Sequence, residues 1–107
     1  MLTRQRALAL LLTCDGDELW DEQYCREQGI PELWIEQLVD NFESGFRSVR
    51  QTIFFEGRLV NQYRGVRAVD LAVKLGEYLG ADVKRATATA LSRTAIVKAI
   101  REAVDEL

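Results

Sequence analysis

The chain has 107 residues, of which 48% are hydrophobic and 29% charged, with a net charge of −3. These values are typical of one globular domain, and no apolar run approaches the roughly 20 residues that cross a bilayer. We therefore expect a single domain over residues 1–107. Histidine is absent, which excludes histidine-based triads, acid–base relays and most transition-metal sites. We expect a protein that is not an enzyme and that holds no metal or cofactor.

A first helix is predicted over residues 4–13, with Thr3 as its N-cap. Cys14 follows this helix, and a second cysteine, Cys25, falls inside the next predicted helix. Two cysteines are too few for a disulfide framework, and both stand beside helical apolar positions where a free thiol packs well. We therefore expect a cytoplasmic protein.

Two further helices are predicted, over residues 18–28 and from Pro31 to about Glu43. Asp17 suits the N-cap of the first, and Gly29 suits its end. Proline favours the first turn of the helix that follows. The acidic part of the domain, residues 1–43, is thus expected to be helical.

A β-hairpin is predicted within the basic part of the domain, residues 44–65. Two β-favouring runs, Thr52–Phe55 and Arg58–Tyr63, flank a turn at Glu56 and Gly57. The alternative is a helix that continues to about residue 54 and breaks at Gly57.

The last part of the chain, residues 66–107, is predicted to be helical again. An apolar stripe runs through residues 66–79, Asp82 caps a segment over residues 83–91, and Ser92 caps the last helix. A second stretch without acidic residues is expected on the solvated faces of these helices; it contains Lys84, Arg85, Arg93, Lys98 and Arg101.

Five residues between Asp21 and Asp40 have the spacing of two helices packed across a tight turn: Cys25, Gly29, Ile30, Ile35 and Leu38. Such a pair needs a small residue at the contact, a glycine in the turn and inward apolar residues on the second helix. With this spacing the segment resembles the helix-turn-helix family, whose second helix enters the major groove of DNA. The resemblance covers about a fifth of the chain. The expected fold class is mainly α, a small helical domain with a helix-turn-helix unit and a short β-hairpin.

The second helix of this unit is acidic, with Glu32, Glu36 and Asp40 among its exposed candidates. DNA-reading helices normally offer Arg, Lys, Asn or Gln to the dense negative charge of DNA. Gln37 and Asn41 are therefore the candidates for nucleic-acid contact on this helix. The alternative is that the unit serves only for packing.

Positive charge lies later in the chain. Residues 1–43 hold three basic and ten acidic residues, a net of −7, whereas residues 44–107 hold eleven and seven, a net of +4. Five arginines surround a single acid, Glu56, and are expected to contact phosphates as a wing does: Arg47, Arg50, Arg58, Arg64 and Arg67. The alternative is that they balance the acidic half across an internal or intersubunit contact.

A longer stretch, Glu56–Asn61 leading into Gly65–Gly76, is similar to the central part of bacteriophage terminase small-subunit-like proteins. In those proteins a helix-turn-helix precedes a strand–turn element and a helix rich in alanine and leucine. The resemblance spans about half the chain from Asp21, and it implies DNA binding and ring-like oligomers.

Two functions follow as hypotheses. The first is a non-enzymatic accessory protein that binds double-stranded DNA, is related to phage or mobile elements, and acts as a homo-oligomer. The second is an acidic helical interaction module, an inhibitor or adaptor, that docks on a basic, nucleic-acid-binding protein.

Overall fold

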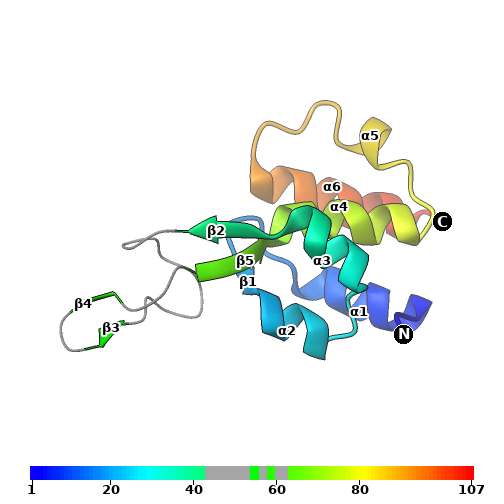
Figure 1. Ribbon diagram of the computed structural model, residues 1–107. Coiled ribbons are helices and arrows are strands. Elements are labelled where there is room, and N and C mark those ends of the chain that lie inside the picture. Colours follow the sequence, from blue (N-terminus) through cyan, green and yellow to red (C-terminus); the bar gives the residue numbers. More distant parts are fainter. Residues whose placement is uncertain (43–53, 56–57, 60–62) are drawn as a thin grey trace.

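The structure is a computed structural model that describes residues 1–42, 54–55, 58–59 and 63–107 (Figure 1). Within these ranges the fold is mainly α, as the sequence predicts. None of the helices described has the length and apolarity needed to span a bilayer. In chain order the elements are α1 (Arg4–Thr13), β1 (Leu19–Asp21), α2 (Glu22–Glu27), α3 (Glu32–Leu38), β2 (Asp40–Phe42), β3 (Phe54–Phe55), β4 (Arg58–Leu59), β5 (Tyr63–Arg67), α4 (Ala68–Tyr78), α5 (Val83–Ala86) and α6 (Arg93–Asp105).

A three-stranded antiparallel sheet, which the sequence did not predict, stands at the start of α4. Its strand order is β1-β5-β2, so the strand that comes last in the chain occupies the centre. Gly65 is opposite both Asp21 of β1 and Asp40 of β2. Because β1 and β2 have only three residues each, their side-chain alternation is too short to distinguish from a helical pattern.

These strands shorten the two helices predicted before residue 44. The helix expected over residues 18–28 begins only at Glu22, because residues 19–21 form β1, and its N-cap is Asp21 rather than Asp17. The helix expected to reach Glu43 ends at Leu38, and β2 begins two residues later.

The hairpin prediction is confirmed at Phe54–Phe55 and Arg58–Leu59. Phe54 is opposite Leu59 and Phe55 is opposite Arg58 in an antiparallel pair. Tyr63, expected at the end of the second strand of the hairpin, begins β5 instead. The competing prediction of a helix as far as residue 54 is wrong at Phe54, which belongs to β3. The rest of both predictions, over residues 43–53, 56–57 and 60–62, lies outside the described residues.

Helix α4 forms the centre of the core. It contacts α1, α3, α5, α6 and the strand β5. Leu71 and Leu75 of α4 are completely buried, as is Ile100 of α6. Gly76 permits this close approach, since a Cβ atom there would lie 2.7 Å from Cγ2 of Ile100.

The helix caps around this core follow the sequence closely. Thr3, Asp82 and Ser92 each accept a hydrogen bond from a backbone N–H in the first turn of α1, α5 and α6. Two predicted extents are wrong: the helix expected from Val66 begins at Ala68, because β5 includes Val66, and the segment expected to reach Leu91 is helical only to Ala86.

Candidate functional site

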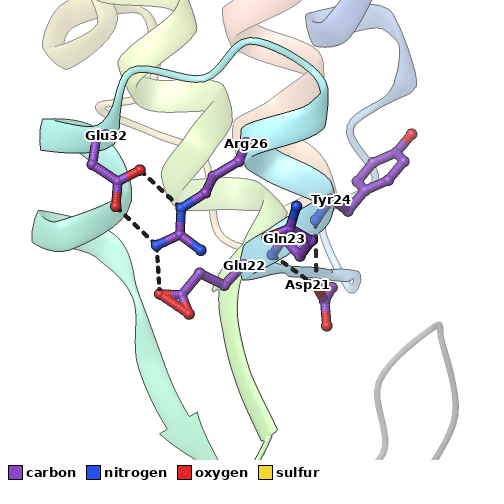
Figure 2. Close-up of polar contacts among 6 residues, drawn as sticks. All are labelled: Asp21, Glu22, Gln23, Tyr24, Arg26 and Glu32. Carbon is purple, nitrogen blue, oxygen red and sulfur yellow. Dashed lines mark hydrogen bonds and ion pairs between the residues drawn. The ribbon is translucent and has the colours of Figure 1, made fainter.

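A tight turn joins α2 to α3, and its geometry comes from the local sequence. Oδ1 of Asp21 accepts hydrogen bonds from the backbone N–H groups of Gln23 at 2.8 Å and Tyr24 at 3.3 Å, which fixes the start of α2 (Figure 2). Gly29 closes the helix with a φ of 88°, a left-handed conformation that favours glycine. The N–H of Ile30 then donates to the carbonyl of Cys25 at 3.1 Å.

The apolar residues chosen by the spacing argument face the interior. Cys25, Ile30 and Ile35 are buried, and Leu38 is half-buried against the same core. Two short helices that would each be marginal alone are therefore held by the core. All four positions therefore contribute to the core.

Arg26 connects α2 to α3 through charged hydrogen bonds, as Figure 2 shows. Its Nε donates to Oε2 of Glu32 at 2.9 Å, and its Nη2 donates to Oε1 of Glu32 at 2.8 Å. The same Nη2 also donates to Oε1 of Glu22 at 3.1 Å. The guanidinium group thus lies between one carboxylate from each helix.

This contact shifts the acidity of both partners. The hydrogen bond from Arg26 lowers the pKa of the Glu32 carboxyl, and the reciprocal bond raises the pKa of the Arg26 guanidinium, with Glu22 contributing to the same effect. Arg26 is the only basic residue in α2 and α3. Its positive charge is therefore shared with two carboxylates on its own surface.

The outer face of α3 offers little to a polyanion. Glu32, Glu36 and Gln37 are exposed, and Leu33 is 62% exposed between them. Two carboxylates repel phosphate groups, and one of them is already bonded to Arg26. Gln37 is the one predicted contact residue that the structure places on the exposed face of α3.

The other predicted contact residues lie in or beyond the strands. Asn41 of β2 is opposite Arg64 of β5 in the register of the sheet, so the structure brings these two positions together. Arg58 belongs to β4. Arg67 is half-buried at the opposite end of β5, opposite Leu19. The remaining two, Arg47 and Arg50, lie outside the described residues.

One predicted surface residue has a structural role instead. Arg101 of α6 donates from Nε to the carbonyl of Leu11 at 3.1 Å, and from Nη2 to the carbonyls of Leu12 at 3.2 Å and of Cys14. These carbonyls end α1, whose last turn has no basic residue of its own. No local sequence pattern predicts this contact, because Arg101 and its partners are far apart in the chain.

The cysteines behave as packing residues. Both are buried and neither forms a disulfide, and burial raises the pKa of the Cys14 thiol to about 12. In the part of the chain that the structure describes, no group of three or more Cys, Asp or Glu side chains is placed to hold a metal ion.

Comparisons with protein-family models, with curated proteins and with solved structures give no match for this chain.

Proposed function

We propose that the protein is a non-enzymatic accessory protein that binds double-stranded DNA through a helix-turn-helix unit with a wing. The unit is α2, the turn at Gly29 and α3, and the wing is the stretch of residues 43–64, which includes the β3–β4 hairpin. The observation that supports this most directly is the chain order: α3 leads into β2, the hairpin follows, and β5 returns between β2 and β1. A hairpin attached in this way to a helix-turn-helix can reach the DNA backbone beside it.

The charge distribution favours the wing over α3 as the main DNA contact. Arg58 lies on β4 and Arg64 on β5, the strands labelled in Figure 1. Arginine binds phosphate oxygens well, because its planar guanidinium offers several donors. The carboxylates on α3 oppose deep insertion into a groove. Binding is therefore expected to depend mostly on the DNA backbone and little on base sequence.

The test is a fluorescence-anisotropy titration of a labelled generic duplex at low salt. The wing variant replaces four arginines with alanine: Arg47, Arg50, Arg58 and Arg64. We expect the native chain to bind and the wing variant to lose most of its affinity. The slope of log affinity against log salt should fall by about 0.9 for each arginine that contacts a phosphate.

A matched control removes the same charge from the exposed surface of α5 and α6. It replaces four basic residues with alanine: Lys84, Arg85, Arg93 and Lys98. Equal loss of affinity in both variants would mean that only net charge matters, and the wing assignment would then be wrong. If the native chain binds no duplex at low salt, the whole proposal fails.

A second candidate function follows from the exposed face of α3. Leu33 is 62% exposed on α3, where Glu36 is also exposed, and Glu27 is exposed on α2. An exposed apolar side chain on an acidic helix fits a basic protein surface with an apolar pocket. We propose as the alternative that the protein is an inhibitor or adaptor docking on a basic, nucleic-acid-binding partner.

An anisotropy titration with an arginine-rich, leucine-containing peptide as the probe distinguishes the two candidate functions. If α3 is the docking face, the native chain binds this peptide, and the variants Leu33→Ser and Glu36→Gln each bind it more weakly. The wing variant should bind it as well as the native chain does. If neither change on α3 weakens the affinity for the peptide, this alternative is wrong.

The compartment, assembly and origin belong to the same proposal. Both cysteines are buried and neither forms a disulfide, which suits the reducing cytoplasm. The opposite net charges of residues 1–43 and 44–107 favour association between copies, so we propose a homo-oligomer. The similarity of Glu56–Asn61 and Gly65–Gly76 to terminase small-subunit-like proteins supports a phage or mobile-element origin.

A further inference from the structure

A groove of about 450 Å³ lies between the end of α1 and the first turns of α6. The turn at Asp15 and Gly16 forms one wall, and Lys98 and Arg101 of α6 form part of the other. Its apolar lining includes Val97 and Leu12, of which Leu12 is 70% exposed. The volume is within the range of small-molecule sites in proteins.

Charges of opposite sign line this groove without pairing. Asp15 and Glu18 lie on the side of α1 and its turn, and Lys98 and Arg101 lie on α6. The ion pairs found among the described residues are both made by Arg26, and so none joins these four side chains. Each charged side chain can therefore pair with a ligand group of opposite charge.

The hydrogen bonds already present leave specific atoms available. Nε and Nη2 of Arg101 donate to the three carbonyls at the end of α1, which fixes the plane of the guanidinium and leaves Nη1 outside these bonds. On the acidic side, Oδ1 of Asp15 accepts from the N–H of Asp17 at 3.1 Å, and Oε2 of Glu18 accepts from Nε1 of Trp20 at 3.3 Å. The other oxygen of each carboxylate takes part in neither bond.

We propose that this groove binds a zwitterionic small molecule of the α-amino-acid class with an apolar side chain. The ligand's carboxylate pairs with Lys98 and with Nη1 of Arg101. Its ammonium group pairs with Asp15 and Glu18, and its side chain covers Leu12 and Val97. A ligand with both charges satisfies both walls at once, whereas a simple anion or cation satisfies one wall and faces repulsion from the other. The inference does not depend on DNA binding.

The experiment is isothermal titration calorimetry of the full chain with leucine, valine and phenylalanine at millimolar concentrations. N-acetyl-leucine amide, which lacks both charges, is the matched probe and is expected not to bind. Lys98→Gln and Asp15→Asn should each weaken binding by about tenfold, the effect of losing one charged hydrogen bond at a binding site. Lys98 and Asp15 are both exposed, so the two variants are expected to stay folded, which circular dichroism checks.

Two further measurements define the outcome. Lys84→Gln, which removes a charge outside the groove, should leave the affinity unchanged. Ligand binding should change the fluorescence of Trp20, because its hydrogen-bond partner Glu18 then also pairs with the ammonium group through its other oxygen. The proposal is overturned if none of the three amino acids binds, if the blocked amide binds equally well, or if the groove variants match Lys84→Gln.

Discussion

At the scale of single residues, Arg26 sets how α2 and α3 meet. Part of this contact is visible in the sequence, since Glu22 precedes Arg26 by four residues in a helix and such pairs attract. The bond to Glu32 is different. It crosses the turn, and it forms only because Gly29 adopts a left-handed conformation that turns α3 back toward Arg26. The sequence therefore predicts the pair of Arg26 with Glu22 but not its pair with Glu32.

The bond to Glu32 predicts how acid affects stability. The folded-state pKa of Glu32 is lowered, so its contribution is present above the unfolded-state value near 4.5 and is lost as pH falls through the lower folded-state pKa. Glu32→Gln should lower the melting temperature at neutral pH by at most a few degrees, since the pair is exposed. Thermal melts at neutral and acid pH should also show a smaller pH dependence in this variant.

Glu36→Gln is the matched control for this prediction. Glu36 is exposed one turn further along α3, and none of the ion pairs among the described residues includes it. If both variants lose the same acid dependence, the effect comes from general charge rather than from the bond to Arg26.

At the scale of elements, local signals were sufficient for the helices and insufficient for the sheet. The first helix and its cap at Thr3 were predicted to the residue, because capping and helical periodicity act over a few neighbouring residues. The strands β1 and β2 take their conformation from pairing with β5, which is remote in the chain. Tertiary pairing of this kind overrides the helical propensity of residues such as Leu19 and Trp20.

Two glycines lie where elements approach closely, and they predict effects of different size. A Cβ atom on Gly16 would lie 2.5 Å from the backbone carbonyl carbon of Arg93 at the start of α6. On Gly76 it would lie 2.7 Å from Cγ2 of Ile100 and 2.8 Å from Cγ2 of Val83, which are side-chain rather than backbone atoms. We expect Gly16→Ala to lower the free energy of unfolding by about 1–3 kcal/mol, the usual effect of overpacking. Gly76→Ala should cost less, since alanine also favours the helix.

Urea denaturation of the two variants measures this difference. Circular dichroism of the native states provides the control, because both variants should keep the helical content of the native chain. If Gly76→Ala is as destabilising as Gly16→Ala, the side chains of Ile100 and Val83 do not yield, and the core around α4 is more rigid than the contact distances indicate.

At the scale of the whole molecule, the sequence predicts where charged residues lie but not which contacts they make. The acidic α3 was evident from Glu32 and Glu36, and the structure keeps both carboxylates exposed. Arg101 was expected on a solvated face, yet it binds the end of α1. The groove between α1 and α6 could not be predicted at all, because its two walls come from opposite ends of the chain.

The opposite charges of the two parts of the chain predict salt-dependent association. Residues 1–43 carry a net charge of −7 and residues 44–107 a net of +4, so two copies attract when unlike surfaces meet. Light scattering after size exclusion should give a mass above the 12.2 kDa of one chain at low salt. The mass should fall toward that value near 1 M salt, where screening reduces the reach of charges to about 3 Å.

A mass that stays at one chain under both conditions would contradict the proposed homo-oligomer. A larger mass that salt does not change would instead indicate an apolar contact between copies, and the charge argument for assembly would be wrong.

The central position of β5 affects how the chain can fold as it is made. Both outer strands are synthesised before β5, and neither pairs with the other. As residues 1–42 leave the ribosome, β1 and β2 have exposed edges and no partner until Tyr63–Arg67 follows. Sheet formation therefore joins segments far apart in sequence, which slows folding relative to the local formation of the helices. During that interval, the apolar residues of α1 also lack α4, the helix that they contact in the finished fold.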